Sequence, residues 1–137
     1  MDYTINKNAS KLIYYCSYFQ LIVCFFSLYY KTYNFTPITI ITFYTSTNYW
    51  INPLKYSKRR FIDILCVLFG ITYHGYVIKD FDFSYNYYTY ISIGSLLYPI
   101  GFFFNNDIII ATNHCILQLL ADFIAINIYR NIYLINK

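Results

Sequence analysis

Long apolar runs, separated by short polar segments, occupy nearly all of this chain. Five of them approach membrane-spanning length, and they cover residues 12–30, 35–51, 61–78, 87–104 and 108–129. A helix needs about 20 apolar residues to cross the hydrocarbon core of a bilayer. Because backbone polar groups in lipid must be satisfied within each segment, the runs predict one all-α domain, a polytopic transmembrane bundle of about five helices.

The first two runs each have an alternative interpretation. The first follows Lys7 and Lys11 and is longer than the apolar region of a cleaved signal peptide, about 7–15 residues, so we expect a spanning helix. The second is rich in threonine and ends just before Pro53. Hydroxyls that bond back to helix carbonyls make such a segment tolerable in lipid. A re-entrant or interfacial segment is the alternative for this second run.

Composition and charge support the membrane class. The chain is 58% hydrophobic and 12% charged, and a typical soluble domain is roughly 25% charged. Its net charge is +4, and the basic residues flank the apolar runs instead of forming a solvated stripe. That placement indicates membrane orientation and argues against nucleic-acid binding. The expected partners are the lipid bilayer and other membrane proteins.

The densest basic segment, residues 55–60, predicts the orientation. Positively charged loops next to membrane spans tend to remain in the cytoplasm. Alternation of five spans then places the N-terminus and residues 55–60 in the cytoplasm and the C-terminus on the opposite side. The sequence therefore predicts an integral membrane location, without indicating which membrane.

Four ionisable side chains lie inside the predicted spans, at Asp63, His74, His114 and Asp122. Such groups are costly in lipid, so each is a candidate functional residue. Asp63 also has a structural explanation, because an acid in a first helical turn, one turn after two arginines, suits the helix dipole and close ion pairing. His74, near the outer end of the same run, is expected to be an interfacial histidine that binds no ligand.

A polar stripe runs along the fifth apolar segment. His114, Gln118 and Asp122 recur at four-residue spacing, which places them on one helical face. We expect this face to point into the bundle. Interhelical hydrogen bonding is its structural interpretation, whereas a metal or substrate site, or the polar path of a small transporter or channel, is the functional alternative.

Depth in the membrane separates these candidates into two groups. Ser46 lies near the inner end of the second run, Asp63 near the inner end of the third, and His114 about two turns into the fifth. These three are expected to meet at one level as a candidate site. His74 and Asp122 belong nearer the opposite face, where structural roles are expected.

Several short motifs resemble one superfamily of membrane hydrolases. They are Ser46 in a segment rich in Thr and Tyr, Asp63 after a basic cluster, and the His114-x-x-x-Gln118 pair. The pattern is similar to that of alkaline ceramidases, progestin/adipoQ receptors and hemolysin III proteins. The resemblance implies seven helices and a zinc ion, held by histidines, whose bound water hydrolyses lipid amides. It implies catalytic roles for Ser46 and Asp63 and metal ligation by His114 and Asp63.

The chain also departs from that pattern. Trp50 stands where the superfamily has its early histidine, Gln118 stands where it has its second late histidine, and about five helices replace seven. A catalytic zinc usually has three protein ligands. We therefore expect a shortened relative without catalytic activity, serving as a structural or interaction component. A ceramidase-like zinc hydrolase is the first alternative, and a small transporter or channel is the second.

Overall fold

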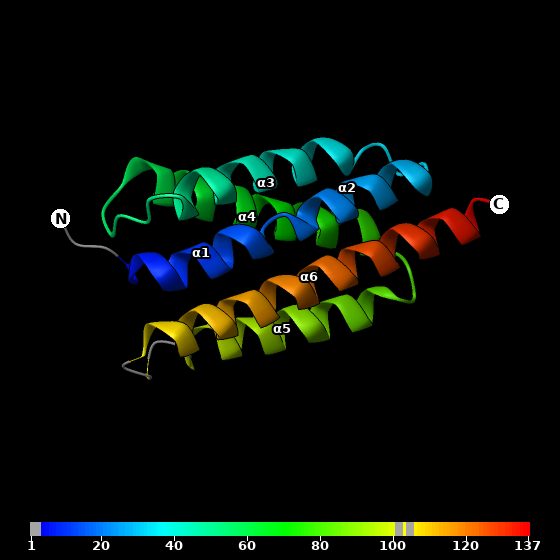
Figure 1. Cartoon of the computed structure of the whole chain (residues 1–137). Helices are drawn as coiled ribbons and strands as arrows, with labels where there is room; N and C mark the ends of the chain where they lie inside the picture. Colours follow the sequence, from blue (N-terminus) through cyan, green and yellow to red (C-terminus); the bar gives the residue numbers. More distant parts are fainter. Residues whose placement is uncertain (1–3, 101–102, 104–105) are drawn as a thin grey trace.

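The computed structural model describes residues 4–100, 103 and 106–137, and its regular structure there is helical, which confirms the all-α prediction. The helices are α1 (Lys7–Cys16), α2 (Phe19–Tyr29), α3 (Thr36–Trp50), α4 (Lys58–Ile78), α5 (Ser84–Ile100) and α6 (Asp107–Ile135). Because α2 continues the direction of α1, the two act as one rod, and the chain then reverses direction at every later connection (Figure 1).

The helical rods form a closed ring of neighbours. The α1–α2 rod contacts α3 on one side and α6 on the other, α3 contacts α4, α4 contacts α5, and α5 contacts α6. As a result, α6 runs parallel to the α1–α2 rod although it lies at the other end of the sequence (Figure 1). Every rod therefore has an inward face and a face that points away from the bundle.

Side-chain caps define three helix starts at one end of the bundle. The side chains of Asn6 and Ser57 accept hydrogen bonds from the backbone of the first turn of α1 and α4, respectively. Asn106 does the same for α6, where its Oδ1 accepts from the Ile108 amide at 2.9 Å. Such caps satisfy backbone N–H groups that have no partner within the helix.

The first apolar run is interrupted, which the sequence did not predict. At the break between α1 and α2, the Tyr18 amide donates to the Tyr15 carbonyl and the Gln20 amide donates to the Ser17 carbonyl, both with three-residue spacing. The Ser17 hydroxyl also donates to the Ile13 carbonyl at 2.9 Å. This tighter spacing and the competing hydroxyl bond explain the break.

Fewer segments qualify as membrane spans by length and hydropathy than the five that the sequence predicts. Within the described residues, three segments are long and apolar enough to cross a membrane, Lys7–Tyr29, Lys58–Ile78 and Asp107–Ile135. The α3 helix has 15 residues and α5 has 17. The first is confined between Pro37, at its start, and Pro53, just past its end, because proline lacks the backbone donor that would continue a helix. Residues 101, 102 and 104 of the predicted run 87–104 lie outside the described residues.

Candidate functional site

Ser46 and Asp63, the two candidate catalytic residues, are in direct contact. The Ser46 hydroxyl donates a hydrogen bond to Asp63 Oδ1 at 2.7 Å, and the Thr45 hydroxyl donates to the same oxygen at 3.2 Å. All three side chains are buried. Burying a carboxyl group without partners is strongly unfavourable, so these two hydroxyls compensate for its removal from water. Thr45 was missed by the sequence analysis, although it is adjacent to Ser46.

The contact between Ser46 and Asp63 is possible because α3 and α4 approach each other closely. Gly70 lies on the same face of α4 as Asp63, two turns later, and is buried against α3. A Cβ atom at Gly70 would lie 3.4 Å from Ile38 Cγ2 and 3.9 Å from the Thr42 hydroxyl oxygen. A side chain larger than a methyl group would therefore push the two helices apart.

The arginines that precede Asp63 lie elsewhere. Arg60 Nη1 donates to the Lys55 carbonyl at 2.8 Å, and Arg59 is exposed. Asp63 instead receives its described hydrogen bonds from the hydroxyls of α3. The partner of the buried acid is thus a neighbouring helix, and the expected pairing within α4 is replaced by an interhelical link.

His114 lies in aromatic surroundings. Its ring packs edge to face on Trp50, with 4.9 Å between ring centroids, and lies 6.1 Å from the ring of Tyr98. Trp50, which occupies the position of the superfamily's early histidine, therefore faces the candidate late histidine. Its indole nitrogen carries a hydrogen and cannot ligate a metal.

The donor set does not fit a catalytic zinc ion. Among the residues that the structure describes, no group of three or more His, Cys, Asp or Glu side chains is arranged to hold a metal. Zinc in a catalytic site usually takes three protein ligands. Trp50 and Gln118 replace two of the histidines that the resemblance requires, so the predicted ligands Asp63 and His114 lack a complete set.

His74, for which the sequence predicted a structural role, links α4 to α6. Its Nδ1 lies 2.7 Å from the Gly70 carbonyl, and its Nε2 lies 3.0 Å from the hydroxyl of Tyr129 on α6. Because a carbonyl only accepts, Nδ1 carries the proton of the neutral ring, and Nε2 accepts from Tyr129. Phe35 from α3 packs on the same ring at a centroid distance of 4.7 Å.

Gln118 and Asp122, the other two members of the polar stripe on α6, each have one buried atom without a described partner. Gln118 Nε2 and Asp122 Oδ2 are buried and have no hydrogen-bond partner in the described structure, and the same holds for Gln20 Oε1 on α2. Gln20 was missed by the sequence analysis. A usable signal existed, since Gln20 is an amide side chain within an uncharged apolar run.

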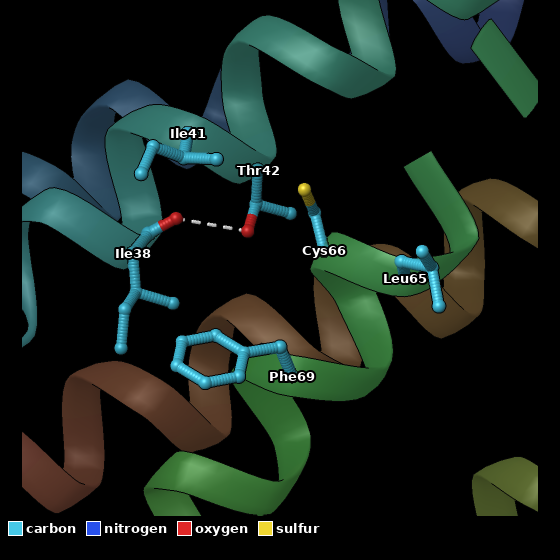
Figure 2. Close-up of a pocket in the computed structure, with 6 residues that line it drawn as sticks. All are labelled: Ile38, Ile41, Thr42, Leu65, Cys66 and Phe69. Atoms are coloured by element: carbon cyan, nitrogen blue, oxygen red, sulfur yellow. Dashed lines mark hydrogen bonds between the residues drawn. The ribbon is translucent and has the colours of Figure 1, made fainter. Parts of the chain in front are cut away.

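The hollow between α3 and α4 is apolar (Figure 2). It has a volume of about 320 Å³ and is lined by Ile38, Ile41, Thr42, Leu65, Cys66 and Phe69. The Thr42 hydroxyl donates to the Ile38 carbonyl of its own helix at 2.9 Å, as the dashed line shows. Since none of the candidate catalytic residues lines this hollow, it suits a hydrocarbon chain better than a reacting polar group.

The described structure defines an all-helical protein with three segments able to cross a membrane by length and composition. Comparisons of the chain with known protein families, curated proteins and solved structures find no match.

Proposed function

We propose that this chain is a small multi-pass integral membrane protein that serves as a non-catalytic structural or interaction component. The observation that carries the proposal is that α4 exposes apolar side chains and buries a polar one, the reverse of a helix in a soluble protein. Phe61 and Phe69 are 64% and 63% exposed, whereas Asp63, between them in sequence, is 8% exposed. Apolar groups outside and a partnered acid inside are favourable when lipid surrounds the bundle.

The exposed area of the whole chain supports the same environment. It amounts to 8787 Å², whereas a soluble monomer of this mass exposes roughly 7,500 Å². Large apolar side chains contribute to this area along most of the helices. Exposed apolar patches of this extent mark contact with a membrane or a protein partner.

The proposed topology keeps five crossings, in which α3 and α5 are the short members. Fifteen residues of α3 span about 22 Å, compared with a hydrocarbon core of about 30 Å. A short helix is accommodated by local thinning of the bilayer or by flanking residues that reach the interface. The ring arrangement supports this, because α3 and α5 each lie between longer neighbours.

The buried polar groups support a structural role. Asp63 joins α4 to α3, and His74 joins α4 to α6. Interhelical hydrogen bonds of this kind hold helices together in lipid, where apolar surfaces have no preference for one another. The side chains that resembled catalytic residues are thus explained by packing.

A zinc-dependent hydrolase is the second candidate, favoured by the 2.7 Å contact between Ser46 and Asp63. Metal analysis of the purified protein, combined with an assay on a ceramide, tests it. We expect zinc well below one ion per chain and no amide hydrolysis. Stoichiometric zinc, together with lipid amidase activity that is lost in Asp63→Ala and in His114→Ala, would overturn the non-catalytic proposal.

Cysteine labelling in sealed membranes tests the topology. In a variant whose four native cysteines are replaced by alanine, a single cysteine is introduced at Tyr56 or at Tyr85, which are 87% and 76% exposed. We expect the protein to stay in the membrane after carbonate washing. A membrane-impermeant maleimide should reach the two positions from opposite sides, with position 56 cytoplasmic. Release by carbonate, or labelling of both from one side, would contradict the proposal.

A further inference from the structure

Three buried side-chain atoms without a described hydrogen-bond partner belong to residues of α2 and α6, two helices that contact each other. They are Gln20 Oε1, Gln118 Nε2 and Asp122 Oδ2, and within the described part of the chain no other buried side-chain atom is in this state. Leaving one such atom unpaired costs about 1–3 kcal/mol. Buried polar groups in native structures are nearly always paired, so unpaired atoms gathered on two facing helices point to a bound partner.

The register of the helices places these three residues at one level. Three contacts between the α1–α2 rod and α6 join Asn6 to Asp107, Cys16 to Cys115 and Tyr30 to Tyr133. The three pairs are 101, 99 and 103 residues apart in sequence, and the rods run in parallel, so the register shifts by only a few residues along the rods (Figure 1). These offsets place Gln20 opposite residues 119–123, at the level of Asp122 and within about one turn of Gln118.

The side chains also share a direction. Gln20 is 8% exposed and lies one turn after Cys16 and one turn before Val23, both of which are buried in the core. Gln118 and Asp122 follow one and two turns after Cys115, which accepts the hydrogen bond of the Cys16 thiol. The Asp122 carboxyl lies within electrostatic range of the Cys16 thiol, which agrees with its place on the side of α6 that carries Cys115.

The chemistry of the three atoms defines the ligand. An amide oxygen and a carboxylate oxygen accept, whereas an amide N–H donates. A ligand that donates two hydrogen bonds and accepts one satisfies all three, and water is the smallest molecule that does so. A metal cation fits poorly, because the Gln118 N–H groups would face its positive charge. Buried waters in proteins typically make about three hydrogen bonds, which matches this set.

We propose that Gln20, Gln118 and Asp122 form a binding site for a single water molecule inside the bundle. The water accepts from Gln118 Nε2 and donates to Gln20 Oε1 and Asp122 Oδ2. If Asp122 takes up a proton, the water accepts from its hydroxyl and donates to Gln20. The site therefore accommodates both protonation states of Asp122 without movement of the helices.

The break in the α1–α2 rod adds support. It lies at residues 17–18, directly before Gln20, and uses backbone bonds of three-residue spacing. In membrane proteins, interrupted helices commonly line buried polar sites. The interruption sets the position of Gln20 relative to α6.

A double-mutant cycle on the full-length protein in mixed micelles tests the site energetically. Gln20→Leu and Gln118→Leu remove one partner each at similar volume and from different helices. We expect each substitution to lower the stability of the protein. Because both remove a partner of one water, their combined effect on the unfolding constant should differ from the product of the single effects by about fivefold or more. As a matched control, Gln20→Leu with Asn127→Leu should be additive, since Asn127 bonds only within α6. If each single substitution raised the stability and the two effects were additive, the polar atoms would be unpaired in the native protein. That result would overturn the proposal.

Magnetic resonance on the unaltered protein provides a second measurement. Gln20 and Gln118 are the only two glutamines in the chain, so selective ¹⁵N-glutamine labelling gives two side-chain amides, which the Gln20→Leu variant assigns. We expect a dipolar cross-peak from the Gln118 amide protons to a long-lived water. A Gln118 amide with no cross-peak to water would overturn the proposal, whatever the stability of the variants.

Discussion

Removing the Ser46 hydroxyl should weaken the link between α3 and α4. In Ser46→Ala, Asp63 Oδ1 loses its 2.7 Å donor and keeps only the Thr45 hydroxyl at 3.2 Å. The substitution deletes one oxygen and leaves the helix backbone unchanged. Because the carboxyl is buried, water cannot easily replace the lost donor.

The size of the effect follows from the kind of bond. A hydrogen bond to a charged group contributes about 1.5–3 kcal/mol in soluble proteins. Interhelical bonds inside membrane proteins average about 0.6 and reach about 1.7 kcal/mol. The short distance and the burial favour the upper part of the membrane range, and the remaining Thr45 bond limits the loss. We therefore expect about 1–2 kcal/mol, roughly a 5- to 30-fold increase in the unfolding constant.

Unfolding by a denaturing detergent in mixed micelles, followed by circular dichroism, measures this effect. Ser95→Ala is the matched control, because Ser95 lies on an exposed face of α5. Its unfolding should change by no more than about 0.5 kcal/mol. In addition, Ser46→Ala should have little further effect in an Asp63→Ala background. Equal effects of Ser46→Ala and Ser95→Ala, or additivity with Asp63→Ala, would refute the reasoning.

Three further stability changes follow from the contacts of α4, α5 and α6. Tyr129→Phe removes the hydroxyl bonded to His74 and should cost about 1 kcal/mol in the same unfolding assay, whereas Tyr29→Phe, at an exposed tyrosine, should be neutral. Gly94→Ala should stabilise by up to about 1 kcal/mol, because the added Cβ would meet only Leu117 Cδ2, at 4.0 Å. Gly75→Ala should stabilise the protein less than Gly94→Ala, since the added Cβ would lie 3.3 Å from ring carbons of two tyrosines. The reverse order of the two glycine variants would contradict this packing argument.

Apolar periodicity and run length predicted the helical class and the approximate helix positions, because lipid-length apolar runs leave few alternatives. They did not predict the break before Gln20, which depends on local three-residue bonds and on the Ser17 hydroxyl. They also overestimated the number of full-length spans, since run length ignores the prolines that lie at the start of α3 and just past its end.

Depth along the helices predicted part of the candidate site. It correctly placed Ser46 and Asp63 at one level, because both lie near helix ends at the same side of the bundle. Depth says nothing about rotation around a helix axis, so it could not predict that His114 packs on Trp50. Depth also failed to predict that His74 bonds to Tyr129, because that contact reaches across the bundle from α4 to α6.

The buried polar groups link helices that are neighbours in the ring, and also helices that face each other across it. Asp63 links α4 to α3 near one end, and His74 links α4 to α6 about 16 Å farther along the same helix. In lipid, apolar surfaces are interchangeable, so helix partners must be selected by close packing and by polar bonds. A bond made by a single pair of side chains disfavours every other arrangement, because the same groups would then be unpaired in the membrane. Helix pairing therefore accounts for both Asp63 and His74 without requiring a reaction at either.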